Sequence, residues 1–546
     1  MTDGLFRLDN LSIFVAIFVS VFSALTILYS IGFMRGRKGL LRYYSYIILT
    51  FLASLGAVFS NNLVLFIVFW GFLALLLYLL IGFSRKDSAA YTAKKTFIII
   101  GGTDAFMLLG LGIIWHLTGT FEIDKMSIAL NTKAAVLAYL CLASGAFAKA
   151  GAMPFHTWVP DVAEDAPTSV TAFLPASLDK LLGIYFLARI SLDVFQMDKG
   201  MNTFLMVMGS VTIVAAVMMA LIQHDMKRLL GYHAVSQVGY MVLGIGTGNP
   251  IGIAGGVFHM LNNAIYKSCL FFSGGSVEKK AGTVDLGKLG GFARVMPITF
   301  VAFLIAAFSI SGVPPFNGFA SKWMIYQGII DSAKAGDKFW VVWIVAAMFG
   351  SALTLASFMK LVHAVFLGRP ASGRKKLKGE AGSTMWVPSV ILAALCVIFG
   401  IFAYQVPLKM FIFPSLGGAA NFTGIWSSGL ATALIIVGVI IGFLIYLAGT
   451  AFKTRTAEPF VGGEILEKHP EMRPSGTEFY DTIRDIGVLQ FIYRLAGRKV
   501  FDIYEVGVKI TLGFNKVLRY IHNGVLLTYL AWCLLGMGVL FYILLK

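Results

Sequence analysis

Charged residues are scarce in this sequence. Only 13% of its 546 residues are Asp, Glu, Lys or Arg, whereas 58% are hydrophobic, and the mean hydropathy is +0.82. A soluble globule could not bury so much apolar surface, so lipid must be the solvent for most of the chain. The apolar segments follow one another with short connections, which indicates one integral membrane domain with an appendage.

Cysteine is also rare. The four cysteines, Cys141, Cys269, Cys396 and Cys533, lie singly in apolar segments. They lack the paired spacings of iron–sulfur clusters and structural zinc sites, so we expect no metal or redox cofactor in this chain. No glycine-rich phosphate loop follows a strand, which argues against a nucleotide-binding enzyme. The first ten residues are polar and mildly acidic, and no removable signal is evident in them.

The net charge of +17 is interpreted as membrane topology and not as nucleic-acid binding. Cations gather in alternate loops, which is the positive-inside bias of a multi-pass protein. We therefore expect a prokaryotic inner-membrane protein with its N-terminus outside and its basic loops in the cytoplasm. These loops contain Arg35, Arg37, Lys38, Arg42, Arg85, Lys86, Lys94, Lys95, Lys227, Arg228, Lys279, Lys280, Lys288, Arg294, Arg369, Arg374, Lys375, Lys376 and Lys378.

The apolar pattern predicts an all-α polytopic membrane protein with about fourteen transmembrane helices, because each crossing needs about 20 apolar residues. Counted from an outside N-terminus, these crossings place every basic loop on the cytoplasmic side. The predicted crossings are residues 11–33, 42–59, 62–83, 96–116, 134–158, 167–190, 203–223, 231–247, 250–275, 296–332, 339–367, 386–405, 428–450 and 527–545.

Two predicted crossings contain similar breaks, GAMPF (151–155) and GVPPF (312–316). Glycine and proline at this spacing interrupt a helix. Five crossings separate the breaks, so the second unit would be inverted in the membrane, as in many secondary transporters. The break residues are Gly151, Pro154, Gly312, Pro314 and Pro315. The predicted domains are 1–41 (N-terminal helix), 42–200 (first five-helix repeat), 201–370 (second, inverted five-helix repeat), 371–452 (two further helices), 453–525 (linker and lateral helix) and 526–546 (final helix).

The composition changes after residue 453. Residues 453–477 are polar and contain three prolines, which indicates a linker on the cytoplasmic face. Residues 479–522 mix cations with apolar residues at intervals of three, and as one helix they would extend over roughly 65 Å. This segment is too polar to cross the bilayer, so we expect a lateral amphipathic helix on the membrane surface or against neighbouring subunits. A solvated tail is the alternative.

Ionisable residues inside the predicted spans are the candidate functional residues, because a charge in the bilayer must be paired or hydrated. Burial favours the neutral form of a lysine and a nearby carboxylate favours the charged form, so such a lysine can load and release a proton. Histidine titrates near neutral pH and suits a relay between lysines. The predicted proton path contains Lys149, Asp179, Lys180, Lys267, His259, Lys322, Asp104, His233, Lys360 and His363.

Some of these residues have a structural alternative. Lys360 and His363 lie near the cytoplasmic end of their span and could extend their polar ends to the surface. Asp104 could be a helix-packing group. Lys227 and Arg228, which are not in the predicted path, are interpreted as loop anchors.

Four motifs follow one another between about residues 60 and 370. They are KAGAMPFHTWVPDV (149–162) with APTSVTAF (166–173), HDMKRLLGYHAVSQVGYMVLG (224–244), FHMLNNAIYKSCLFFSGGSV (258–277) and SGVPPFNGFASKW (311–323). In this order they resemble the antiporter-like membrane subunits of respiratory complex I, Mrp sodium/proton antiporters and membrane-bound hydrogenases. The segment SALTLASFMKLVHAVFLG (351–368) most resembles the hydrogenase and formate-lyase type.

The resemblance implies roles for matching positions and a set of partners. Iron–sulfur and nickel–iron centres are expected only in partner subunits. The other expected partners are paralogous antiporter-like subunits, small helical subunits and lipids. The implied roles are central lysine of the first half-channel (Lys149), connecting lysine (Lys180), central residue of the second half (Lys267), terminal lysine at the exit (Lys322), connecting histidine (His259) and acidic partner (Asp104).

The sequence departs from the family pattern at the first half-channel. The family usually has a glutamate that forms a switchable ion pair with the lysine-bearing broken helix, and this chain has Gly71 there. Our hypothesis is that Asp179 supplies the missing negative charge, with Asp104 as the alternative.

Two further departures concern the proton wire and the N-terminus. Pro175 and Asn263 stand where the family usually has histidines, which alters the wire. The segment FRLDNLSIF (6–14) matches the family's third helix. The resemblance therefore implies that two N-terminal helices come from a separate small subunit.

The leading expectation is a proton-translocating subunit of a redox-driven complex, closer to a hydrogenase than to a quinone-reducing complex I. One alternative is a subunit of an Mrp-type sodium/proton antiporter. Another is a structural or energy-coupling subunit whose channel is inactive because of Gly71. Protons are favoured over sodium, because lysines cannot ligate sodium and the midmembrane carboxylates are few.

Overall fold

The computed structural model describes residues 4–368, 379–418, 420, 422, 428–449, 477–478 and 480–545. Contacts divide the chain into two compact units, Met1–Asp485 and Ile486–Lys546. The predicted linker 453–477 lies outside the described residues except at its last position, and so do the last basic residues, 369–378.

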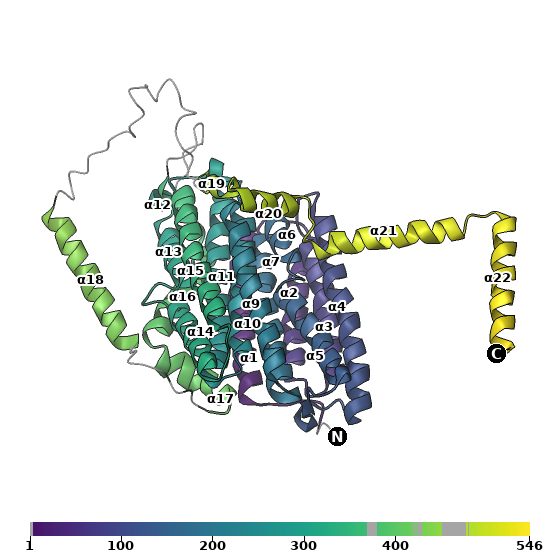
Figure 1. Cartoon of the computed structure of the whole chain (residues 1–546). Coiled ribbons are helices and arrows are strands. Elements are labelled where there is room, and N and C mark those ends of the chain that lie inside the picture. The colour runs from purple at the N-terminus through teal and green to yellow at the C-terminus, as the bar shows by residue number, and fades with distance from the viewer. Residues whose placement is uncertain are drawn as a thin grey trace. The chain divides into compact units, whose positions relative to one another are not determined.

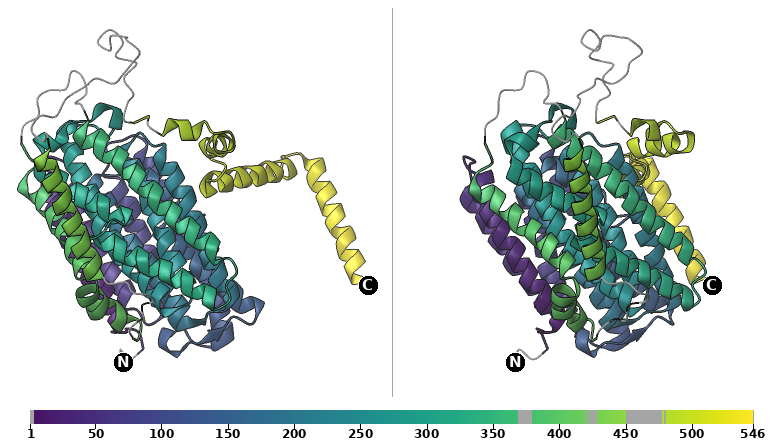
Figure 2. Two further views of the ribbon diagram at one scale, coloured as in Figure 1. Left: turned by 60° about the vertical axis from the view of Figure 1, so that its left-hand side comes forward. Right: turned by 90° about the vertical axis from the view of Figure 1, so that its left-hand side faces the viewer.

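The first unit contains a bundle of helices that stand side by side (Figures 1 and 2), and the start of α1 lies at the opposite end of the bundle from α12. Two short strands, β1 (Ile128–Ala129) and β2 (Phe195–Gln196), pair in parallel. The helices are α1 (Asn10–Phe33), α2 (Leu40–Phe59), α3 (Leu63–Ile81), α4 (Ala89–Thr118), η1 (Ile123–Lys125), α5 (Lys133–Ala150), α6 (Trp158–Asp165), α7 (Thr168–Phe173), η2 (Leu174–Leu178), α8 (Asp179–Arg189), η3 (Ile190–Val194), α9 (Lys199–Leu221), α10 (Met226–Gly246), α11 (Pro250–Ala281), η4 (Leu286–Lys288), α12 (Phe292–Val295), α13 (Pro297–Ser311), α14 (Asn317–Lys334), α15 (Trp340–Val362), η5 (His363–Leu367), α16 (Ser383–Ile401), η6 (Tyr404–Ile412), α17 (Phe413–Ser415), α18 (Ser428–Ala448) and α19 (Asp481–Arg484).

Helices α10 and α11 are the most enclosed long helices of the bundle. α10 packs against α9 and α11, and α11 also packs against α13, α14 and α16. Every residue of α10 except Arg228 is buried. Because the side chains of these helices face protein and not lipid, polar residues and glycines are tolerated on them.

Ten helical segments in the described part of the chain are long and apolar enough to cross a membrane. They coincide with ten of the predicted crossings, so the chain is a polytopic α-helical membrane protein. The other four predicted crossings are helical but do not meet the same criterion. α10 and α11 are too polar, the break divides α13 from α14, and α18 provides only the shorter apolar segment Ala433–Ala448. The number fourteen and the inverted repeat therefore stay predictions.

The second unit consists of α20 (Gly487–Gly497), α21 (Ile503–Ile521) and α22 (Leu526–Leu544). The predicted amphipathic segment is not one continuous helix. The chain leaves the helical path between α20 and α21, where Lys499 has a φ of 56°, a left-handed conformation that is uncommon for a residue with a side chain. α22 is long and apolar enough to cross a membrane.

Candidate functional site

The first predicted break ends α5 inside the bundle. Gly151 closes α5 with a φ of 78°, which favours glycine. An added Cβ there would also lie 2.5 Å from Val159 and 3.0 Å from Lys180 Nζ. The chain then turns into α6, where the Trp158 indole donates a hydrogen bond of 2.9 Å to the carbonyl of Ala148. Glycine is therefore required at this break both for backbone conformation and for space.

Lys149 and Asp179 form an ion pair beside this break. Lys149 lies in the last turn of α5, and Asp179 begins α8 directly after the π-helical turn η2. The distance from Nζ to Oδ1 is 3.7 Å, and both side chains are 0% exposed. The ring of Trp70 lies 5.3 Å from Nζ. Among the described residues neither charged group has a hydrogen-bond partner, so each depends on the charge of the other.

Lys180 follows Asp179 in sequence but contacts the broken end of α5. Successive side chains on a helix point about 100° apart, so the two residues serve different sides of α8. Lys180 Nζ donates a hydrogen bond to the carbonyl of Ala150, the last residue of α5, and lies 5.8 Å from the ring of Trp158. Carbonyls at a helix C-terminus carry partial negative charge, which attracts the ammonium group.

The second predicted break repeats this arrangement. α13 ends at Gly312, whose φ is 80°. Lys322 on α14 donates a hydrogen bond of 2.8 Å to the carbonyl of Ile310 at the end of α13, and its Nζ lies 4.7 Å from the ring of Tyr240. A buried lysine therefore contacts the carbonyl end of each broken helix.

His259 lies at the centre of a buried polar cluster between α10, α11 and α14. Its Nδ1 is 2.9 Å from Ser321 Oγ, and its Nε2 is 3.1 Å from Gln237 Oε1 and 3.3 Å from the hydroxyl of Tyr266. Both ring nitrogens therefore have polar partners. A histidine held in this way can pass a proton from one side of its ring to the other.

Lys267 and His233 extend the buried polar residues toward α15. Lys267 donates a hydrogen bond of 2.9 Å to the carbonyl of Leu230, and its Nζ lies 5.6 Å from the ring of Phe358. His233 Nε2 lies 2.7 Å from Ser357 Oγ. All of these side chains are buried in the bundle.

Electrostatic interactions connect the buried ionisable residues across both breaks. A change of charge on one group alters the proton affinity of the next. Both carboxylates in this series interact with Lys149, whereas the second half of the series consists of lysines and histidines. In order, the linked residues are Asp104, Lys149, Asp179, Lys180, Lys267, His233, Lys322 and His259.

The remaining predicted path residues lie at the margin of this series or outside it. Asp104 on α4 is partly exposed but interacts with Lys149. Lys360 is 5% exposed and donates a hydrogen bond of 2.9 Å to the carbonyl of Leu221, so it caps the end of α9 and does not extend to the surface. His363 begins the π-helical turn η5 and its side chain is exposed, so the structure does not bring it to the buried residues.

Sequence analysis missed an ion-pair cluster that surrounds α6. Lys95, only 2% exposed, lies 2.7 Å from Asp161, and Arg228 lies 2.5 Å from Glu164. Lys227 donates a hydrogen bond to the carbonyl that follows α6, which agrees with the interpretation of both basic residues as anchors. The acidic residues a few positions after the first break could have indicated this cluster, but their basic partners lie more than 60 residues away in sequence.

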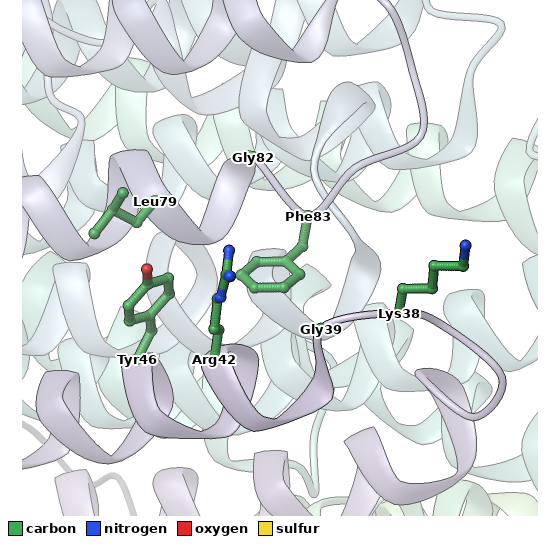
Figure 3. Close-up of a pocket in the computed structure, with 7 residues that line it drawn as sticks. All are labelled: Lys38, Gly39, Arg42, Tyr46, Leu79, Gly82 and Phe83. Carbon is green, nitrogen blue, oxygen red and sulfur yellow. The ribbon is translucent and has the colours of Figure 1, made fainter.

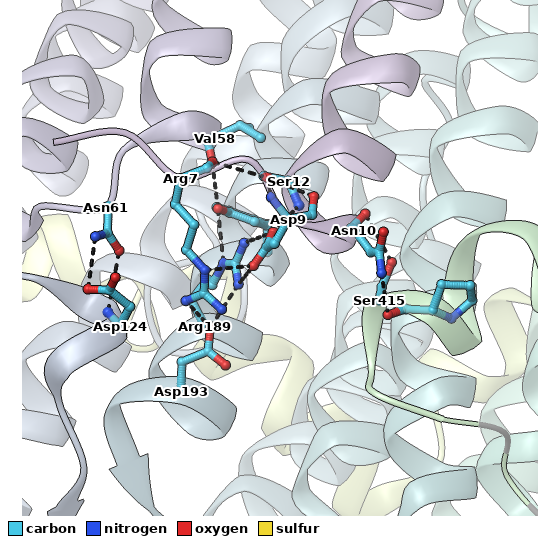
Figure 4. A network of polar contacts seen from close by, with 12 residues as sticks. Arg7, Asp9, Asn10, Ser12, Val58, Asn61, Asp124, Arg189, Asp193 and Ser415 are labelled. Carbon is cyan, nitrogen blue, oxygen red and sulfur yellow. Dashed lines mark hydrogen bonds and ion pairs between the residues drawn. The ribbon is translucent and has the colours of Figure 1, made fainter. Parts of the chain in front are cut away.

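Two cavities lie apart from the buried lysines. One of about 530 Å³ lies between α2 and α3 (Figure 3), and another of about 520 Å³ lies beside Arg189 at the end of α8. Arg189 forms ion pairs with Asp9 at 2.5 Å and with Asp193 at 2.7 Å (Figure 4). Burial alone raises the pKa of Asp9, but the hydrogen bonds and the charge of Arg189 outweigh it and lower that pKa to about 2.

Comparison with protein families identifies the bundle. Residues 60–354, more than half of the chain and including both breaks, match the family described as "NADH:quinone oxidoreductase/Mrp antiporter, TM". Residues 4–44 match "NADH-Ubiquinone oxidoreductase (complex I), chain 5 N-terminus". The chain belongs to the NADH:quinone oxidoreductase/Mrp antiporter family. This confirms the family that the four motifs indicated.

Curated relatives within this family are named as sodium/proton antiporter subunits. The A1 subunit of the Na(+)/H(+) antiporter of Staphylococcus haemolyticus is 34% identical over 421 residues, which are 72% of this chain and 52% of that protein. A Na(+)/H(+) antiporter subunit from Alkalihalophilus pseudofirmus is 31% identical over 419 residues, again 72% and 52%. The chain spans about half the length of the curated relatives it matches. These names agree with the antiporter alternative better than with the hydrogenase type suggested by residues 351–368.

Two solved membrane complexes each contain a chain whose fold is similar to that of this chain. A chain of the Mrp complex from Dietzia sp. DQ12-45-1b has a TM-score of 0.68 at 23% identity, over 76% of this chain and 86% of that chain. A chain of the membrane-bound sulfane sulfur reductase, an archaeal respiratory membrane complex, has a TM-score of 0.81 at 22% identity, over 98% and 89%. At these identities the likeness concerns the fold.

Proposed function

We propose that this chain moves protons across the membrane as an antiporter-like component of an Mrp-type sodium/proton antiporter. The names of the curated relatives support the coupling to sodium. The buried lysines support the proton as the ion that this chain carries, because an ammonium group can release a proton but cannot ligate sodium. Other antiporter-like and small membrane subunits are the proposed partners, together with lipids.

The ion pair between Lys149 and Asp179 carries this proposal. Two opposite charges in a dry interior cost several kcal/mol of desolvation, and their mutual attraction offsets much of that cost. When the proton passes from the ammonium group to the carboxylate, both groups become neutral and the cost disappears. The pair therefore has two states of comparable free energy, and a small change in the surrounding charge can select between them.

The remaining buried residues extend this exchange to the second half. The charge of Asp179 also affects the proton affinity of Lys180. The charge of Lys180 affects that of Lys267, and the charge of Lys267 affects that of His233. A proton that leaves Lys149 therefore changes the proton affinity of groups beyond the first break. In the proposed path His259 and Lys322 complete the transfer near the second break.

Transport driven by an ion gradient alone tests the proposal. The assembled complex is reconstituted into vesicles without an electron donor, a sodium gradient is imposed, and the internal pH is followed with a dye. We expect Lys149→Gln to slow the pH change about a hundredfold, as loss of a proton-transfer group does. The matched control is Lys334→Gln, which removes an exposed lysine. Transport by Lys149→Gln at the control rate contradicts the proposal.

Membership of a redox-driven respiratory complex is the second candidate. The chain of the sulfane sulfur reductase complex aligns with 98% of this chain, against 76% for the Mrp complex, and this coverage favours it. In that case iron–sulfur and nickel–iron centres would belong to partner subunits. Vesicles that move protons only after an electron donor is added, and not under a sodium gradient, would support this candidate and exclude the first.

A further inference from the structure

The cavity between α2 and α3 combines cations with an apolar wall. Arg42 and Tyr46 extend from α2 toward Leu79 of α3 and toward Phe83 in the loop that follows α3, and Lys38 lies on the far side of Phe83 (Figure 3). Its volume is about 530 Å³. The cavity lies where α2 begins and α3 ends, so its charged edge is at the surface of the bundle and its apolar wall continues into the membrane-crossing segments.

The edge of this cavity is strongly positive. The two adjoining segments, residues 34–42 and 82–88, contain six cations and one acid, Asp87, and Lys86 is paired with Asp165 at 3.8 Å. Burial and the nearby charge of Arg85 both lower the pKa of Arg37, as expected where cations crowd together. The exposed side chains of Lys38 and Arg42 make no ion pair within the part of the chain that the structure describes. The six cations are Arg35, Arg37, Lys38, Arg42, Arg85 and Lys86.

Apolar side chains continue from the cavity along the outer surface of the same two helices. Leu49 on α2 follows Tyr46 at helical spacing and is 39% exposed. Leu75 and Phe72 on α3 precede Leu79 at helical spacing and are 39% and 43% exposed. Because α2 and α3 are long and apolar enough to cross the membrane, these side chains face the acyl-chain region.

The geometry points to a binding site for one anionic phospholipid, with Arg42 on the phosphate, Tyr46 beside the headgroup, and the acyl chains along Leu49 and Leu75. A guanidinium group can bind a phosphate through two parallel hydrogen bonds. Basic pockets between membrane helices are suited to anionic headgroups. A free anion would use the cations and leave the apolar surface uncovered, so the combination favours a lipid.

Lipid binding to the assembled complex tests this site. The complex is purified, its lipid is removed with detergent, and short-chain phosphatidylglycerol is titrated while binding is counted by native mass spectrometry. We expect one saturable molecule at this site, and about tenfold weaker binding by Arg42→Gln, the effect of losing a charged hydrogen bond. Leu79→Trp should weaken binding similarly because it fills the cavity without changing the charge. Phosphatidylcholine of the same chain length should bind about tenfold more weakly.

The matched control is Arg294→Gln, which removes an exposed cation of another basic loop. It should bind phosphatidylglycerol like the unaltered chain. If Arg42→Gln and Arg294→Gln weaken lipid binding equally, the overall charge of the chain explains the effect and the proposed site is overturned. Displacement of the lipid by inorganic phosphate at equal concentration would assign the site to a free anion. Absence of saturable binding in the intact complex, because a neighbouring protein covers the cavity, would overturn the proposal as well. If Leu79→Trp fails to fold, the comparison of the two arginine variants still decides.

Discussion

The two broken halves of the bundle position their lysines alike but surround them with different charges. Lys180 contacts the carbonyl end of α5, and Lys322 contacts the carbonyl end of α13. Only in the first half does the structure place a carboxylate in the interior, with Asp179 at 3.7 Å from Lys149 among the described residues. The break itself therefore requires a cation near exposed carbonyls, whereas the acid is a separate feature of one half.

This difference gives the halves different electrical properties. A lysine beside an acid can become neutral by passing its proton over a few ångströms, and the total charge of the pair does not change. Lys267 has a carbonyl as its hydrogen-bond partner, so it can lose its charge only if the proton moves on to another group. The first half is therefore suited to respond to a change of charge, and the second half to pass a proton along.

Removal of the interior acid should have the largest effect on transport. Asp179→Asn keeps the size of the side chain but leaves Lys149 without its partner, and we expect proton transport to fall about a hundredfold. Asp104→Asn, the alternative acid, should reduce transport less than about threefold, because Asp104 is partly exposed and its interaction with Lys149 is weaker than that of Asp179. Vesicle transport measures both. The reverse order of effects would assign the negative charge to Asp104.

Loss of a buried lysine should lower the free energy of unfolding more in the first half than in the second. Lys149→Met leaves Asp179 buried without a partner, which costs about 3–5 kcal/mol. Lys267→Met leaves only the carbonyl of Leu230 unpaired, which costs about 1–3 kcal/mol before the gain from removing a buried charge. Denaturant unfolding of the purified chain in detergent compares them. The double variant Lys149→Met with Asp179→Leu should recover most of the loss, and equal destabilisation by the two single variants would refute the comparison.

A glutamate at position 71, where the family usually has one, tests whether transport through the first half depends on an acid. An added Cβ at Gly71 has no atom within 4 Å, so a longer side chain can be accommodated there. In the Asp179→Asn background, Gly71→Glu should recover transport about tenfold. Gly71→Gln is the control for size. Equal recovery by both would show that packing and not charge is responsible.

Local chemistry allowed the sequence to predict the breaks, because Gly151 and Gly312 occupy left-handed conformations and proline cannot continue a helix. The structure also brings Asp179 beside Lys149, as the sequence hypothesis requires. That pairing could be predicted because both residues lie in interior helices and Lys149 lacks the glutamate that is its usual partner in the family.

Other features depend on contacts that no local pattern contains. His363 is exposed at the start of the π-helical turn η5, although it follows the buried Lys360 at helical spacing. The pairing of Lys95 with Asp161 joins residues 66 positions apart. Lys499 adopts a conformation typical of glycine, so nothing in the composition indicated the separation of α20 from α21.

The ion pair at the other end of α8 provides the smallest and last test of the comparison. Asp9 is 25% exposed on its side chain and pairs with Arg189, whereas the core pair is fully buried. Asp9→Asn should therefore lower the free energy of unfolding by only about 1 kcal/mol at pH 7. The folded-state pKa of Asp9 is lowered to about 2, so its contribution is complete above the unfolded value of about 3.9 and is lost as the pH falls toward 2. Unfolding at several pH values should show a constant difference between the two chains from pH 8 to pH 5 and a shrinking one below pH 4. A loss as large as that of Lys149→Met would mean that partial exposure does not weaken the pair, and the contrast between the core acid and the surface acid would fail.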